Sequence, residues 1–211
     1  LYNGYGEHNI QGIGDKHVPL IHNVMNTDMV VGVSDRATDR LNLVFNSDAG
    51  RSYLTKRLRL DPALVRGLGA LGLSGIANVL AAIKPARRLD PSENPAIFTV
   101  ATDSAELYAS ERDKVAAIHY PNGFDEVSAA AAFGQHVAGL ADDHVLELTQ
   151  SERRRIFNLG YFTWVEQQGV PLKEFDARKD QGFWLGLRDL LPVWDRQIEE
   201  FNRRTGVNRP G

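Results

Sequence analysis

The sequence predicts an α/β fold in which a parallel sheet is covered by helices. Two short apolar, β-branched runs, residues 28–33 and 96–101, have the composition of buried strands. Between them, residues 76–83 place apolar side chains at helical spacing. This alternation of strand, helix and strand is typical of a sheet whose strands run parallel.

Composition limits the class of protein. The chain has 211 residues, 43% of them hydrophobic and 24% charged, which suits one large globular domain or one domain with an extension. A net charge of -3 gives no reason to expect a nucleic-acid or membrane partner. No apolar run approaches the roughly 20 residues of a membrane helix. The chain lacks cysteine, which excludes disulfides and fits a cytoplasmic location.

The first half offers clear helix starts. Ser34 is placed to cap a helix that continues to Phe45. Pro62 suits the first position of another helix, where its missing N–H is not needed. Ser74 is expected to cap the helix of residues 76–83.

After about residue 110 the pattern becomes helical. Residues 128–141 are rich in alanine, and residues 145–148 form a short strand-like run. Ser151 is placed to cap a further helix. Apolar residues recur at helical spacing over residues 183–201, a stripe typical of core or subunit contacts.

Two places carry candidate chemistry. Gly12 and Gly14 flank Ile13 and would let a ligand approach the backbone closely, although a tight turn explains them equally well. Asp103 and Ser104 end the second predicted strand, where ligands gather in open α/β sheets, although helix capping is the alternative. No histidine pair has the i, i+4 spacing of a helical zinc site, so no metal is expected.

Three segments carry a resemblance to a known family. They are His8–Gly14 (HNIQGIG), Gly72–Ala77 (GLSGIA) and Asp103–Tyr108 (DSAELY). In this order they resemble segments of fold-type II pyridoxal-phosphate enzymes, which include cysteine synthase, cystathionine β-synthase and threonine dehydratase. The resemblance covers about residues 8 to 108. It implies pyridoxal 5'-phosphate as cofactor and the parallel three-layer sheet of the tryptophan synthase β-like architecture.

The resemblance also implies roles for single residues. Ser104 would contact the pyridine nitrogen of the cofactor, with Asp103 beside it as the alternative partner. A neutral hydroxyl there makes the ring a milder electron sink than a carboxylate would. Gly12 would also approach the cofactor. The residues implied to face the substrate are Gly12, Ile13, Gly14 and Asp15.

Part of the family pattern is missing. Members carry a Schiff-base lysine, a substrate-carboxylate loop and a phosphate-binding loop, all ahead of the first matching segment. Lys16, Lys56 and Lys84 do not stand in matching contexts, so no catalytic residue is expected in this chain. Residues 1–110 would form the C-terminal half of the large cofactor-binding domain, and residues 111–211 a helical extension. An N-terminal segment or companion chain would complete the unit, which we expect to be a homodimer.

The resulting hypothesis is the C-terminal portion of an enzyme for β-elimination or β-replacement on a small amino acid. The alternative within enzymes is a threonine or serine dehydratase-type deaminase. A non-catalytic regulatory scaffold chain is the alternative outside enzymes, and the absent lysine favours it.

Overall fold

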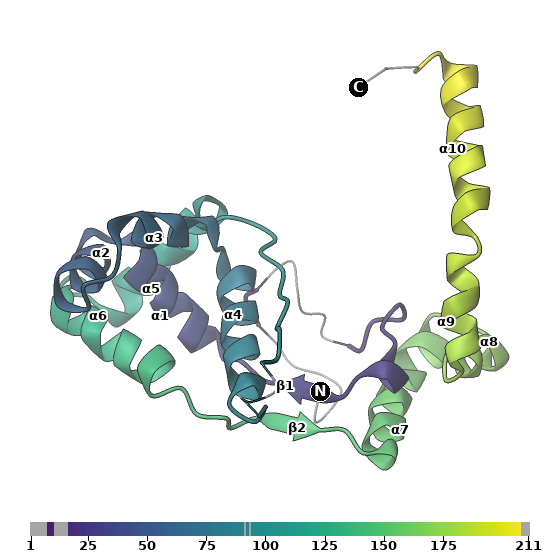
Figure 1. Cartoon of the computed structure of the whole chain (residues 1–211), viewed down its shortest axis with the longest axis horizontal. Helices are drawn as coiled ribbons and strands as arrows, with labels where there is room; N and C mark the ends of the chain where they lie inside the picture. The colour runs from purple at the N-terminus through teal and green to yellow at the C-terminus, as the bar shows by residue number, and fades with distance from the viewer. Residues whose placement is uncertain (1–7, 11–16, 91, 93, 208–211) are drawn as a thin grey trace. The chain divides into compact units, whose positions relative to one another are not determined.

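The computed structural model of the chain describes residues 8–10, 17–90, 92 and 94–207 (Figure 1). Helices make up 64% of it. The described residues divide into two compact units. The central unit contains residues 8–10 and 29–147, apart from 91 and 93, and the terminal unit contains residues 17–28 and 148–207.

The central unit is a helical array with one small sheet. Its strands are β1 (Met29–Val31) and β2 (Val145–Glu147). Its α-helices are α1 (Asp35–Asn46), α2 (Asp48–Ser52), α3 (Pro62–Gly67), α4 (Leu73–Ala86), α5 (Ala109–His119) and α6 (Glu126–Phe133). Two π-helices, η2 (Tyr53–Arg57) and η6 (Gly134–Ala138), and two 3₁₀ helices, η3 (Leu68–Ala70) and η5 (Ala105–Tyr108), join them.

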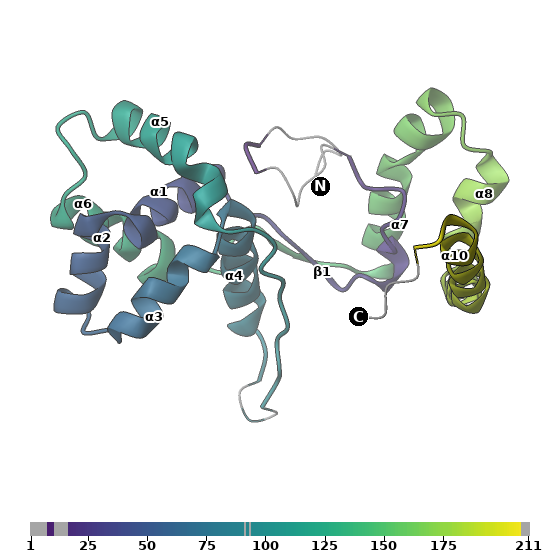
Figure 2. The ribbon, with the colours of Figure 1, turned by 90° about the horizontal axis from the view of Figure 1, so that it is seen from above.

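Helix α1 lies at the centre of this unit and contacts α2, α4, α5 and α6 (Figure 2). The Ser34 hydroxyl caps it by accepting a hydrogen bond from the Ala37 amide at 3.3 Å, as the sequence predicts. Leu41 and Val44 are completely enclosed. The buried apolar cluster around them comprises Ala37, Leu41, Val44, Phe45, Leu54, Val65, Ile76, Leu80, Ala129 and Ala132.

The predicted parallel three-layer sheet is wrong. The two described strands pair antiparallel, with Val30 opposite Leu146. Residues 96–101 form no strand, and Phe98 is 93% exposed. This segment runs back beside α4, where the Asn78 amide donates to the Val100 carbonyl at 2.8 Å (Figure 2). A β-branched run favours extended backbone, but only a partner strand converts it into a sheet.

Of the other elements predicted from the sequence, some are confirmed and two predicted helix caps are wrong. Helix α1 and the start of α3 at Pro62 are confirmed, and the strand-like run 145–148 contains β2. Ser74 does not cap α4, because Gly72 holds that position and Ser74 lies buried inside the helix. Ser151 does not cap α7 either, since the Thr149 hydroxyl accepts the hydrogen bond there.

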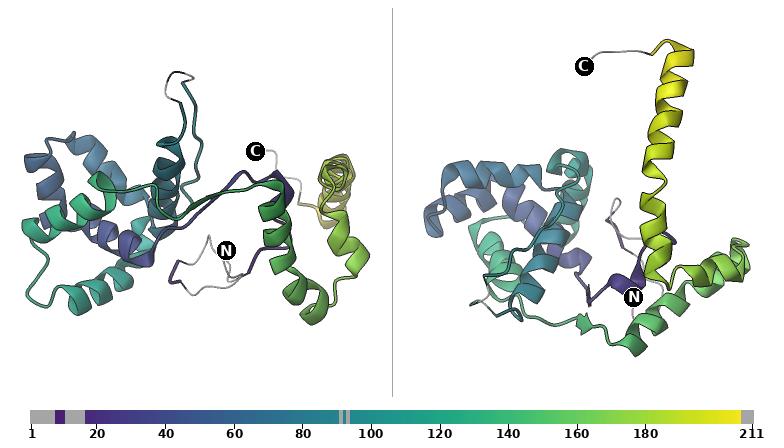
Figure 3. Two further views of the ribbon diagram at one scale, coloured as in Figure 1. Left: turned by 90° about the horizontal axis from the view of Figure 1, so that it is seen from below. Right: turned by 45° about the vertical axis from the view of Figure 1, so that its right-hand side comes forward.

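In the terminal unit the structure describes six helical segments, of which the last five follow one another along the chain and run from green to yellow in Figure 3. They are η1 (Val24–Asn26), α7 (Gln150–Leu159), the π-helix η7 (Phe162–Gln167), α8 (Leu172–Ala177), α9 (Gln181–Arg188) and α10 (Leu191–Thr205).

Arg178 and Trp164 join the two chain segments of this unit. The Arg178 guanidinium stacks 4.5 Å from the Phe175 ring centre and donates to the Leu20 carbonyl. The Trp164 indole donates to the Val18 carbonyl at 2.8 Å. Residues 17–28 are therefore held against the helices by bonds from side chain to backbone.

No single described helix is long and apolar enough to cross a membrane. Residues Pro62–Ala70 and Leu73–Ala86 meet the length and composition criteria only as a pair bent by 114°. Much of α4 in this pair is buried in the core.

Replacing Leu41 with alanine should destabilise the chain by about 2–5 kcal/mol, because the vacated volume lies in an enclosed core. Urea unfolding followed by circular dichroism measures this loss. Leu64→Ala is the matched control, since Leu64 is 56% exposed and should change stability by less than about 1 kcal/mol. Equal losses in both variants would contradict the packing described around α1.

Candidate functional site

The three segments that carry the family resemblance meet in the central unit. Ile10, Leu73, Ala77 and Tyr108 form one buried apolar cluster. Each segment supplies at least one of these side chains, although up to about a hundred positions separate them in the sequence. Proximity in space does not follow from order along the chain, so the cluster is an independent observation.

Gly72 brings two of these segments into backbone contact. Its amide donates to the Asp103 carbonyl at 2.8 Å. A Cβ atom at this position would lie 2.5 Å from Asp103 Oδ1 and 2.7 Å from Tyr108 Cε2. Only glycine therefore fits here without displacing both side chains.

Tyr108 and Asp103 form a short hydrogen bond in which the phenol donates to Oδ2 of the carboxylate. The Thr102 hydroxyl donates to the other oxygen at 3.2 Å. Burial, and then the bond to Asp103, raises the pKa of the Tyr108 phenol. Both carboxylate oxygens of Asp103 are thus already engaged inside the protein.

Two serine hydroxyls lie in the same region. Ser104 is partly buried at the start of η5, and its hydroxyl makes no hydrogen bond to another described residue. Ser74 is fully buried and makes no hydrogen bond of standard geometry there either, although its proximity to Tyr108 opposes the rise in that pKa. Ser104 is the more exposed of the two, and its hydroxyl retains the capacity to bond a ligand.

The first predicted segment is described only at residues 8–10. Gly12, Ile13, Gly14 and Asp15, the predicted substrate contacts, lie outside the described residues. Asn9 is anchored to α1, since its side-chain amide donates to both Asp39 oxygens at 3.0 Å and its backbone amide donates to Asp35 Oδ2 at 3.0 Å. A cavity of about 270 Å³ lies beside this anchor and is lined partly by His8, Ile10 and Asn78.

A larger cavity, of about 670 Å³, opens at the N-terminus of α1. We call it the α1 cavity. Its wall consists of Gly32, Val33, Ser34, Arg36, Ala37, Leu80, Lys84, Gln135, His136, Gly139, Leu140, Ala141, Asp143 and His144. The sequence gives no sign of this site, because its residues come from three separate stretches of the chain and form no spacing motif.

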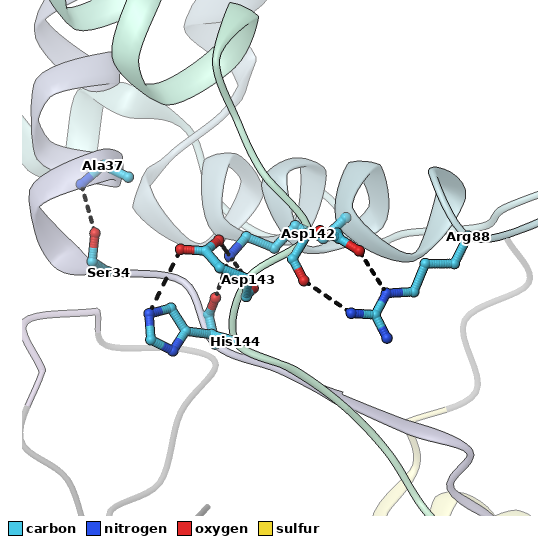
Figure 4. Close-up of polar contacts among 8 residues, drawn as sticks. Ser34, Ala37, Arg88, Asp142, Asp143 and His144 are labelled. Carbon is cyan, nitrogen blue, oxygen red and sulfur yellow. Dashed lines mark hydrogen bonds and ion pairs between the residues drawn. The ribbon is translucent and has the colours of Figure 1, made fainter.

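Lys84 makes three hydrogen bonds in the wall of the α1 cavity, a wall to which Ser34, Asp143 and His144 also belong (Figure 4 labels these three residues). Its ammonium donates to the Gly32 carbonyl at 3.1 Å, to the Asp143 carbonyl at 2.7 Å and to Asp143 Oδ1 at 2.8 Å. These three acceptors use all three of its donors. Lys84 is therefore a structural link between α4 and the chain preceding β2, and it is unsuited to a covalent role.

His136 is buried like Lys84, with 7% of its surface exposed. Unlike the Lys84 ammonium, its Nε2 has no hydrogen-bond partner among the described residues. Burial, followed by the charges of Arg40 and Arg36, lowers its pKa. The described residues contain no cluster of three or more histidine, aspartate or glutamate side chains able to hold a metal ion.

Gly72→Ala should destabilise the chain by about 1–3 kcal/mol, because the added methyl group overlaps Asp103 and Tyr108. Chemical denaturation provides the measurement. Gly67→Ala is the control, since a Cβ there meets nothing within 4 Å and the substitution should be neutral or stabilising by up to about 1 kcal/mol. An unchanged free energy of unfolding in Gly72→Ala would show that Asp103 and Tyr108 can move aside for the methyl group, contrary to the close contact described.

The lowered pKa of His136 predicts a loss of stability in acid. Since the folded state disfavours the protonated ring, its contribution is complete above the unfolded pKa of about 6.5 and is lost as pH falls towards the folded value. His136→Gln should therefore flatten the fall in unfolding free energy between about pH 7 and pH 5. Urea titrations across this range test the prediction, and parallel curves for the two proteins would contradict it.

Comparison of the chain with protein-family models, with curated proteins and with solved structures finds no match.

Proposed function

We propose that this chain contributes one wall of a pyridoxal-phosphate site in a cytoplasmic enzyme for β-elimination or β-replacement on a small amino acid. The observation that supports the proposal is the cluster of Ile10, Leu73, Ala77 and Tyr108. It joins the same segments whose order suggests this class of enzyme. The Schiff-base lysine belongs, in this proposal, to a segment or companion chain beyond the printed sequence.

The side chains around the cluster suit this cofactor. Asp103 is engaged by Tyr108 and Thr102, so it orders the loop instead of facing a ligand. Ser104 keeps an uncommitted hydroxyl and is the residue we assign to the pyridine nitrogen. A hydroxyl can hold an unprotonated nitrogen by donating to it, whereas a carboxylate would favour the protonated form.

In this proposal the cofactor and the residues around it have separate roles. Pyridoxal phosphate, when bound, supplies an electron sink for bonds at the substrate α-carbon. Gly72 lets the Asp103 loop approach α4, and Tyr108 fixes the carboxylate, so the backbone that carries Ser104 is held at both ends. Such fixed positioning keeps a polar contact from reorganising during reaction.

A non-catalytic regulatory chain is the second candidate, and the placement of lysine favours it. Lys84 is fully committed to Gly32 and Asp143, and Lys56 is exposed on η2. Neither belongs to the cluster of Ile10, Leu73, Ala77 and Tyr108. If no amine reaches the cluster, the chain could bind a ligand there but could not form a covalent adduct with it.

The decisive experiment is to isolate the tagged chain from its native cells together with whatever co-purifies. A yellow preparation that contains a second polypeptide, or a longer form of the chain, and that borohydride bleaches would support the enzyme. Ser104→Ala should then shift the visible spectrum and lower turnover about tenfold, the loss expected for one hydrogen bond of about 1.4 kcal/mol.

Ser110→Ala is the matched control, because Ser110 is exposed in the first turns of α5 and lies outside the cluster. It should leave spectrum and turnover unchanged. A colourless preparation that takes up no cofactor would contradict the enzyme proposal and favour the non-catalytic regulatory chain. An identical spectrum and turnover in Ser104→Ala would remove Ser104 from the site.

A further inference from the structure

The α1 cavity has the construction of a small-molecule site. Its volume of about 670 Å³ falls in the range that encloses small ligands. Val33, Leu80 and Leu140 supply apolar wall, and polar groups gather where Ser34 begins α1. An apolar pocket with a few convergent polar groups is the usual form of such sites.

The polar part of this cavity is electropositive. The first turn of α1, a helix of 12 residues, presents backbone amides and the positive end of the helix dipole. Arg36 contributes a guanidinium to the wall. Asp35, in the same helix turn, lines the smaller cavity instead, where its carboxylate accepts from the Asn9 amide at 3.0 Å. Asp143 is therefore the acidic side chain in the described wall of the α1 cavity, and Lys84 pairs with it at 2.8 Å.

His136 gives a second and independent indication of a ligand. This side chain is nine-tenths buried in the wall of the cavity, yet its Nε2 has no hydrogen-bond partner among the described residues. Leaving a buried polar nitrogen unpaired is destabilising, and native proteins usually avoid it. A bound acceptor would satisfy a protonated Nε2, as it would the helix amides.

We propose that the α1 cavity binds a small organic anion whose carboxylate or phosphate head lies between the first turn of α1, Arg36 and His136, with its apolar part against Val33 and Leu140. The site is distinct from the cluster around Tyr108. It therefore does not depend on the proposed pyridoxal-phosphate function.

Binding of an anion should increase the fraction of His136 that is protonated. Arg36 and Arg40 on α1 face His136 and disfavour its charged form, while Lys84, Asp143 and His144 line the same cavity. The negative charge of a bound anion opposes the effect of these two arginines and favours the protonated His136 ring. Affinity should accordingly rise as pH falls from about 8 to about 6, and His136→Gln should remove most of this rise.

Titration of the isotopically labelled full chain, followed by amide NMR, tests the proposal. The probes are inorganic phosphate, butyl phosphate and pentanoate, with pentanamide as the neutral analogue. We expect saturable shifts at residues of α1 and η6 with a dissociation constant of about 1 mM or below for at least one anion. Preference for butyl phosphate or for pentanoate identifies the head group, and binding of pentanamide as tightly as pentanoate would overturn the anion assignment.

Two variants with the same charge change, one inside the cavity wall and one outside it, test whether binding occurs in the α1 cavity. Arg36→Gln should weaken binding about tenfold, the effect of losing one charge-assisted hydrogen bond. Arg66→Gln makes the same charge change at an exposed position of α3 outside the cavity, and it should have no effect. Equal weakening by both variants, or absence of saturable binding to the wild type, would overturn the proposal. Weakening by Ser104→Ala as large as that by Arg36→Gln would show that the two sites are one.

Discussion

The enclosure of α1 is the constraint on which the central unit depends. Helices α2, α4, α5 and α6 all contact it, so its buried face extends beyond one stripe. Two of its buried polar side chains are satisfied locally, since the Thr38 hydroxyl donates to the Asp35 carbonyl and the Asn42 side chain accepts from Asn46. A helix can be enclosed in this way only when its polar groups find partners within it or close beside it.

Both candidate sites follow from this central helix. On one side, Asn9 bonds to Asp35 and Asp39 and brings the segment of residues 8–10 towards α4. At the N-terminus of α1, Arg36 and Ala37 line the α1 cavity. The two places differ in chemistry. The cluster around Tyr108 is apolar, with the hydrogen-bonded Asp103 carboxylate and the Ser104 hydroxyl beside it. The α1 cavity is lined by Arg36, His136 and the first turn of α1.

Local signals in the sequence predicted the starts of α1 and α3 correctly. Ser34 caps α1 because its hydroxyl reaches an amide three residues away, and Pro62 opens α3 because that position needs no N–H. The error over residues 96–101 has a different origin. Their composition describes a preference for extended backbone, while strand pairing depends on what lies beside them, which here is α4.

Ser74 shows a similar limit at a single residue. A serine before an apolar helix is a good cap by composition, but the close contact of Gly72 with Asp103 starts the helix two residues earlier and buries Ser74 within it. The α1 cavity could not have been predicted either, because Arg36, Lys84, His136 and Asp143 share no motif.

The sequence by itself determined the starts of α1 and α3 and the helical character of the second half. Each of these rests on spacing or on hydrogen bonds within a few residues. Tertiary structure alone decided that β1 pairs antiparallel with β2, that residues 96–101 stay unpaired, and that Gly72, Asp103 and Tyr108 meet. Those outcomes depend on contacts between distant segments, whose free energies no local pattern encodes.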